Sequence, residues 1–338
     1  MKNGIRNTLG ILLSVLLLWW TMKGTSVSAV WAVLSRSSLP LWIGCMVFGT
    51  AIFPLRARRW QALLAPVAGR LPFGPLWRST AVGMMSSNVI PLRPGEFVRA
   101  FALSREEPRV RFTAAVASVA VDRLFDTVVI LLMMLVATLD PAFPSQQKIG
   151  DHTIAVWLTI PAVLFSAVLV GLVIFLIAPD RVFAMADAVV RRLAPRFEPA
   201  VRSHLEGFVS GLHVLRRPRL PAEVFFWTVL HWLCNAFAFW LGFRALHLNA
   251  PFSAALLLQG LIAIGVAIPS SPGFFGPFEA VGKAGLAIYG VSNTIAVSWV
   301  IGFHVLTFVP ITVMGAWYLS RMKLHFSDLT GAAKAAPT

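Results

Sequence analysis

The chain has 338 residues, of which 57% are hydrophobic and only 13% are charged, and its mean hydropathy is +0.76. This balance excludes an ordinary soluble domain and is typical of a polytopic membrane protein. The formal net charge of +15 does not indicate nucleic-acid binding, because the arginines occur in short segments between apolar runs, where membrane topology explains them.

A membrane-spanning helix needs about 20 mainly apolar residues. The first segment of this kind resembles a signal peptide, but further spans follow it, so we expect it to be retained. Six segments are predicted to cross the membrane: 8–24, 38–56, 112–138, 154–178, 223–246 and 294–319.

Two other apolar stretches are too short to cross, and a motif rich in proline and glycine interrupts each of them. Both motifs read Ile-Pro-x-x-Pro-Gly followed by a glutamate and a basic residue, and they lie roughly half the chain apart. We predict two re-entrant helical hairpins, at about 76–106 and 253–290, because such irregular backbone must face the interior of a membrane protein. The residues expected to form the breaks are Pro91, Pro94, Gly95, Pro269, Pro272, Gly273 and Gly276.

The basic residues orient these elements, since arginine and lysine favour the cytoplasmic side. This rule assigns Arg56, Arg58 and Arg59 to a cytoplasmic loop, places the arginine-rich loop 179–221 in the cytoplasm, and makes the two hairpins enter from opposite sides. The predicted fold is therefore an all-α inverted-topology repeat with about six full transmembrane helices and two re-entrant hairpins. The repeats comprise residues 1–153 and 154–324, followed by a cytoplasmic tail at 325–338.

Each break starts a helix whose N-terminus points into the protein, and such an end favours an anion, for example a lipid phosphate. Glu96 and Glu279 lie in the first turns of these helices, where they could instead cap the helix without any ligand. Arg93 needs a partner at membrane depth, either a phosphate or a nearby carboxylate. The second motif has no counterpart of Arg93 and has Ser270 and Ser271 instead.

Asp122, Arg123 and Asp126 lie within the predicted span 112–138, where charges are costly and indicate a functional or interhelical role. Asp122 and Asp126 share a helix face, and Arg123 can pair with Asp126. His304 occupies the position in the second half that corresponds to Asp126, so both are candidates for proton coupling, although a lone histidine in an apolar helix is more often a packing residue.

The sequence has no glycine-rich phosphate loop, no cluster of metal ligands and no recognisable nucleophilic triad. We therefore expect no metal, no cofactor and no enzyme active site. An intramembrane enzyme that uses Asp122, Asp126, His231 and His304 is the alternative.

Four groups of residues together resemble the lysylphosphatidylglycerol synthase transmembrane region, which is the flippase part of the multiple peptide resistance factor. They are Arg-x-Arg-Arg-Trp at 56–60, Asn88-x-x-Pro91-x-Arg93-x-Gly95-Glu96 with Arg99, Asp122-Arg123, and Pro269-x-x-Pro272-Gly273-x-x-Gly276-x-x-Glu279. The resemblance covers about residues 8–320. It implies translocation of a lipid, in known members an aminoacylated phosphatidylglycerol. We expect no synthesis of that lipid, because no soluble aminoacyl-transferring domain follows the last span.

The resemblance and the motifs together predict a flippase-like lipid translocase of the bacterial inner membrane, with both termini in the cytoplasm and an anionic or aminoacylated phospholipid as its partner. One alternative is a secondary transporter of a small anion or amphiphile. Another is a membrane scaffold for a lipid- or glycan-modifying enzyme, and a homo-oligomer also fits. The candidate substrate-binding residues are Arg93, Glu96, Arg99, Asp122, Arg123, Ser270, Ser271 and Glu279.

Overall fold

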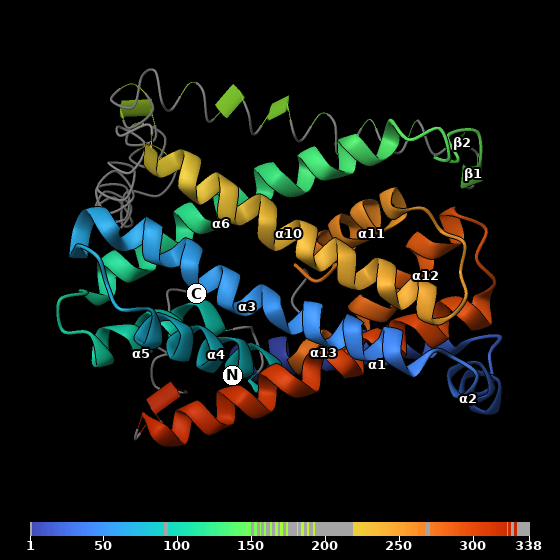
Figure 1. Ribbon diagram of the computed structural model, residues 1–338, viewed down its shortest axis with the longest axis horizontal. Coiled ribbons are helices and arrows are strands. Elements are labelled where there is room, and N and C mark those ends of the chain that lie inside the picture. The colour runs from blue at the N-terminus through green and yellow to red at the C-terminus, as the bar shows by residue number, and fades with distance from the viewer. Residues whose placement is uncertain are drawn as a thin grey trace.

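Four helices that run along the longest dimension form the body of the molecule (Figure 1). The computed structural model describes residues 2–90 (the backbone alone for 2–9), 94–149, 152–153, 219–267, 271–322, 324–325 and 328–329, with scattered single positions between 156 and 192. The four helices are α3 (Leu39–Ala68), α6 (Phe112–Thr138), α10 (Arg219–Ala245) and α13 (Asn293–Arg321). Of these, α3, α10 and α13 are each long and apolar enough to cross a membrane, whereas α6 has the length but carries three charged residues. The chain is an all-α polytopic membrane protein, as predicted.

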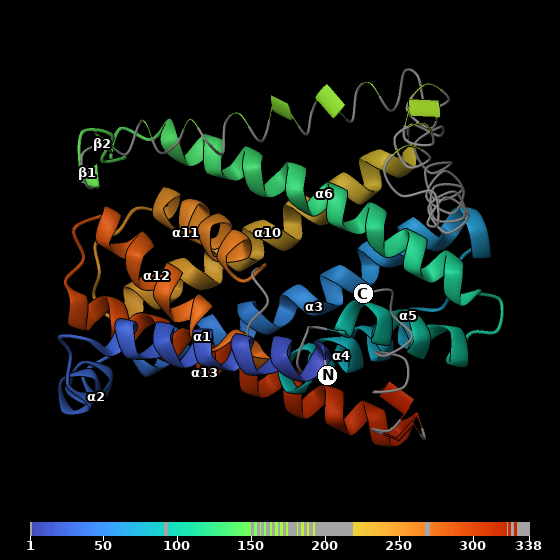
Figure 2. The same cartoon turned by 180° about the vertical axis from the view of Figure 1, so that it is seen from behind.

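The two proline and glycine motifs separate pairs of short helices, as the sequence predicts. The first pair is α4 (Phe73–Val89) and α5 (Gly95–Glu106), and the second is α11 (Phe252–Gly265) and α12 (Pro277–Ile288) with the short helix η3 (Pro272–Phe274) between them. The two hairpins lie toward opposite ends of the molecule, as both views show (Figures 1 and 2), and η3 contacts α4. Their re-entry into the membrane and the division into inverted repeats stay predictions.

Glycine permits the helices of the first hairpin to approach closely. A Cβ atom on Gly83 would lie 2.6 Å from both the Gly95 carbonyl oxygen and the Arg99 Cβ, and a Cβ on Gly95 would overlap Ser87 Oγ and the Gly83 carbonyl oxygen. Small residues at helix contacts are the usual means of close packing within a membrane. The contact fixes α5 against α4 and thereby orients the charged residues that α5 carries.

A short helix that was not predicted from the sequence follows the first predicted span at 8–24. Helix α1 (Lys2–Met22) is followed by α2 (Val27–Ser35), and the two axes are bent by 69° at the intervening residues. Gly24 has φ +79°, which a residue with a side chain rarely adopts, so the turn suits glycine. Helix α1 packs on α12, whereas α2 packs on α13.

Helix α3 continues to Ala68, beyond the predicted end of the second membrane crossing at about residue 56. Downstream of α6, the short strands β1 (Lys148–Ile149) and β2 (His152–Thr153) form an antiparallel pair. The predicted span at 154–178 and the arginine-rich loop at 179–221 lie almost wholly outside the described residues.

The tail contributes to the packing of the first hairpin, which its sequence did not suggest. Leu329 is fully buried and belongs to an apolar cluster with Val82, Ile90 and Val98. Helix α13 contacts the same hairpin through Thr312, whose hydroxyl accepts a hydrogen bond from the Asn88 amide at 2.7 Å. The first hairpin is therefore completed by residues from the other end of the chain.

Candidate functional site

Charged side chains from three helices converge in the interior. Each helix contributes a pair spaced three residues apart, which places both side chains on one helix face. We call the following seven residues the ionic cluster: Arg56 and Arg59 from α3, Glu96 and Arg99 from α5, and Asp122, Arg123 and Asp126 from α6.

The inner part of the ionic cluster is sealed from solvent. Arg59 Nε lies 2.5 Å from Asp122 Oδ1, Arg59 Nη1 lies 2.5 Å from Asp126 Oδ1, and the Arg59 and Asp122 side chains are 0% exposed. Arg99 Nη2 donates to Asp122 Oδ2 at 2.7 Å. Because a buried charge is costly without an opposite charge, these pairs hold α3, α5 and α6 together.

Helix α10 closes the inner part from a fourth side. Trp232 Nε1 donates a hydrogen bond to Asp126 Oδ1 at 2.8 Å, and Arg59 Nη1 donates to the Thr228 hydroxyl at 3.4 Å. His231 is buried next to Trp232, with a ring-centroid separation of 4.8 Å. Asp126 therefore accepts hydrogen bonds from side chains of both α3 and α10.

The outer part of the cluster is accessible. The Glu96 side chain is 28% exposed and that of Arg123 is 44% exposed, and the two form an ion pair. Arg56 Nη2 also donates to Glu96 Oε1 at 3.0 Å, and Arg99 Nε lies 2.9 Å from Glu96 Oε2. Four guanidinium groups thus face three carboxylates among the described residues, which leaves one positive charge without a matched anion in the cluster.

The predicted pair of Arg123 and Asp126 is confirmed, with Arg123 Nη1 3.1 Å from Asp126 Oδ2. Asp126 and His304 do not meet in one site. Asp126 belongs to the ionic cluster, whereas the His304 ring nitrogen Nδ1 lies 2.5 Å from Glu279 Oε1 in the second hairpin. Proton coupling through either residue stays a prediction.

The second motif forms a separate, closed polar site. Glu279 Oε2 accepts a hydrogen bond from the Gly276 backbone N–H at 2.7 Å, so this carboxylate caps α12 as well as binding His304. The Phe275 and Phe278 rings lie 4.5 Å and 4.4 Å from the His304 ring between centroids. Glu279 and His304 are 2% and 5% exposed, so the pair faces protein rather than solvent.

Helix α1 covers this second site. The Ser14 hydroxyl accepts a hydrogen bond from the Ser271 backbone N–H at 2.9 Å, and Lys283 Nζ donates to the Thr21 carbonyl oxygen at 2.9 Å. Gly276 has φ +100°, and a Cβ there would lie 2.6 Å from the Ser14 carbonyl oxygen. The Ser271 hydroxyl donates to the Phe275 carbonyl oxygen at 3.0 Å, so its present partner lies within the hairpin.

Residues 7–315 match the family model described as Lysylphosphatidylglycerol synthase TM region, which is nearly the whole chain. The chain belongs to this family. No curated protein matches it. The family relates the chain to membrane lipids, and among the described residues no group of three or more metal-ligating side chains forms a metal site.

Arg56 and Arg59 were not predicted from the sequence as members of the site. Both were assigned to a loop, although their spacing of three residues places them on one face of a continued helix. The predicted site residues Glu96, Arg99, Asp122 and Arg123 do come together. Four predicted residues lie outside the described ones: Pro91, Arg93, Pro269 and Ser270.

We expect Glu279→Ala to lower the free energy of unfolding by about 1–3 kcal/mol, because it leaves the Gly276 N–H and the His304 ring without their buried partner. Glu279→Gln should cost less, since its amide oxygen still accepts from Gly276 and its amide nitrogen can donate to a neutral His304. Reversible unfolding of the purified protein in mixed micelles measures both. Equal losses for the two variants would show that the charge, and not the hydrogen bonds, stabilises the hairpin.

Proposed function

We propose that this chain is a flippase-like translocase that moves an anionic or aminoacylated phospholipid between the leaflets of the inner membrane. The observation that supports the proposal best is the ionic cluster, which combines an unmatched positive charge with an accessible edge at Glu96 and Arg123. A guanidinium at such an edge suits a phosphate, and a carboxylate beside it suits an amine.

In this mechanism the headgroup replaces contacts that the cluster already makes. The lipid phosphate displaces Glu96 from Arg123 and Arg56, and the freed Glu96 carboxylate then binds the amine of an aminoacylated headgroup. The inner pairs around Arg59 stay intact and keep the helices in place, while the acyl chains remain in the bilayer. The phosphate takes over the contacts of Glu96 with Arg123 and Arg56. The amine of an aminoacylated headgroup gives the displaced carboxylate a new partner, which offsets the cost of separating the original pairs in an interior of low dielectric constant.

The distribution of basic residues supports placing the end of the molecule that carries the first hairpin on the cytoplasmic side. Four helix termini lie beside the first hairpin at one end of the molecule (Figure 1). They are the C-termini of α3 and α13 and the N-termini of α6 and α10. Arginine is the principal charge at these positions, which favours the cytoplasmic side. We therefore propose that the first hairpin opens toward the cytoplasm. The arginines concerned are Arg58, Arg70, Arg109, Arg111, Arg219 and Arg321.

The test is the transbilayer movement of labelled phosphatidylglycerol and lysyl-phosphatidylglycerol in proteoliposomes that contain the purified chain. We expect Arg123→Ala to slow both lipids at least tenfold, and Glu96→Gln to slow the aminoacylated lipid more than the simple one, because only that lipid carries an amine. Rates are measured by chemical quenching of the label in the outer leaflet.

A matched control lies just beyond α5. Glu107 and Arg109 form an exposed ion pair of the same type, with 2.9 Å between Arg109 Nη2 and Glu107 Oε2. Glu107→Gln and Arg109→Ala should leave transport unchanged. Movement that no cluster variant alters, or no movement above empty liposomes, would contradict the proposal. Uptake of a soluble anion driven by a proton gradient would instead favour a secondary transporter.

A further inference from the structure

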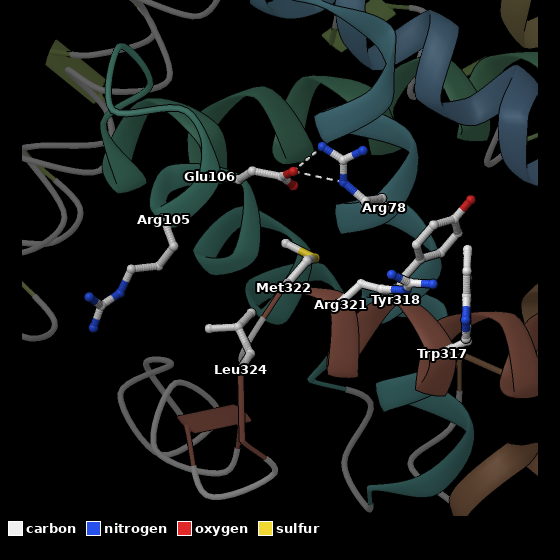
Figure 3. Close-up of a pocket in the computed structure, with 8 residues that line it drawn as sticks. All are labelled: Arg78, Arg105, Glu106, Trp317, Tyr318, Arg321, Met322 and Leu324. Carbon is white, nitrogen blue, oxygen red and sulfur yellow. Dashed lines mark hydrogen bonds and ion pairs between the residues drawn. The ribbon is translucent and has the colours of Figure 1, made fainter.

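A second basic site lies on the surface of the first hairpin, apart from the ionic cluster. It is a pocket of about 590 Å³ between α4, α5 and the end of α13 (Figure 3). Arg105 lies on one side of it and Arg321 on the other, with Met322 and Leu324 between them. The lining residues are Arg78, Arg105, Glu106, Trp317, Tyr318, Arg321, Met322 and Leu324.

The pocket has more positive than negative charge. Arg78 is neutralised by Glu106, since Arg78 Nε donates to Glu106 Oε1 at 2.7 Å. Among the described residues, neither Arg105 nor Arg321 has a carboxylate partner. Each guanidinium instead lies 5.3 Å from an aromatic ring centroid, Arg105 over Phe101 and Arg321 over Trp317. Each of these two guanidinium groups therefore has no neutralising carboxylate in the part of the chain that the structure describes, and the two lie on opposite sides of the pocket (Figure 3).

The aromatic residues of the pocket indicate its depth in the membrane. Trp317 is 51% exposed and lies one turn before the end of α13, which is long enough to cross the membrane. The Tyr318 hydroxyl accepts a hydrogen bond from Trp77 Nε1 at 2.9 Å, which fixes its ring at the pocket wall. Tryptophan and tyrosine with arginine at the end of a span mark the level of the lipid headgroups.

We propose that this pocket binds the phosphate of an anionic phospholipid from the adjacent leaflet. Basic pockets between helices at the membrane surface suit such headgroups, and the planar fork of a guanidinium matches two phosphate oxygens. Binding here does not depend on translocation, because the pocket shares no residue with the ionic cluster. The site thus adds lipid recognition at the surface to the activity proposed above.

The test uses the full-length chain in detergent, with phosphatidylglycerol as the probe, phosphatidylcholine as the neutral comparison, and retained lipid measured by native mass spectrometry. We expect preferential retention of phosphatidylglycerol by the wild type and at least a tenfold weaker affinity in the double variant Arg105→Ala/Arg321→Ala. The double variant Arg105→Lys/Arg321→Lys should retain part of the affinity, because lysine keeps the positive charge but lacks the planar, forked hydrogen-bond donors of a guanidinium group. Far-ultraviolet circular dichroism confirms that each variant is folded.

The matched control is Arg36→Ala/Arg244→Ala, which removes two arginines at the opposite end of the molecule, one of them also beside a tryptophan. Affinity should be unchanged in this control. Equal retention of phosphatidylglycerol by the wild type and both alanine pairs would overturn the proposal. Binding of inorganic phosphate that the Arg105→Ala/Arg321→Ala pair abolishes, without retention of phosphatidylglycerol, would overturn the assignment to a lipid.

Discussion

Replacing Arg59 by alanine is expected to lower the free energy of unfolding by about 3–5 kcal/mol, which is a large share of the total stability of a typical domain. The guanidinium lies 2.5 Å from carboxylate oxygens of both Asp122 and Asp126, and it is fully buried. Without it, two carboxylates remain buried in the interior with only part of their negative charge compensated. Unfolding by sodium dodecyl sulfate in mixed micelles measures the loss.

The neighbouring Arg58 provides the control for Arg59. It is exposed on the same helix, and it donates from Nη1 to the Gln61 side-chain oxygen at 3.1 Å. Arg58→Ala should cost less than about 1 kcal/mol. Adding Asp126→Asn to Arg59→Ala should restore part of the lost stability, because a buried negative charge is removed as well. Similar losses for Arg58→Ala and Arg59→Ala would mean that the inner pairs do not support the fold.

The second large effect is expected for Gly95→Val, which should lower the free energy of unfolding by about 3 kcal/mol. A Cβ at this position already overlaps the Gly83 carbonyl oxygen and Ser87 Oγ, and two further methyl groups must push α5 away from α4. That displacement also moves Glu96 and Arg99, so lipid transport should fall together with stability. Micelle unfolding and the liposome assay measure the two losses.

Gly74→Ala at the start of α4 is the matched control for Gly95→Val. Its Cβ would lie 3.1 Å from Arg78 Nη1, the flexible end of a side chain that can move aside. Alanine also favours a helix over glycine by up to about 1 kcal/mol, so this variant should be as stable as the wild type or slightly more so. A comparable loss in both glycine variants would indicate that the first hairpin tolerates no substitution of glycine, rather than a close contact at Gly95.

Much of the fold follows from the sequence because long apolar segments predict the helices and the proline and glycine motifs predict where helices break. The predicted segment at 112–138 is α6, and the two proline and glycine motifs do end and restart helices. Proline removes a backbone donor, and a glycine with positive φ permits a turn that other residues resist, so such breaks are visible without a structure. The presence of charges in the middle of α6 likewise predicted a polar interior site.

The remaining features depend on distant contacts that no local pattern contains. Arg56 and Arg59 look like cytoplasmic loop charges until their distant partners are known. Arg56 pairs with Glu96, and Arg59 pairs with Asp122 and Asp126, more than sixty residues later. The pairing of His304 with Glu279 is equally invisible, because a capping glutamate and a lone histidine each have a local explanation. Sequence periodicity shows which face of a helix is polar, but not which other face it meets.

The dependence of the first hairpin on α13 has a consequence for how the chain is made. The Asn88 side chain finds its hydrogen-bond partner Thr312, and Ile90 its neighbour Leu329, only after more than two hundred further residues have been synthesised. At roughly 5–20 residues per second this interval is on the order of 10–40 s. Until then Asn88 and Ile90 lack these two partners, so α13 and the residues after it complete a structure whose first part is made near the start of synthesis.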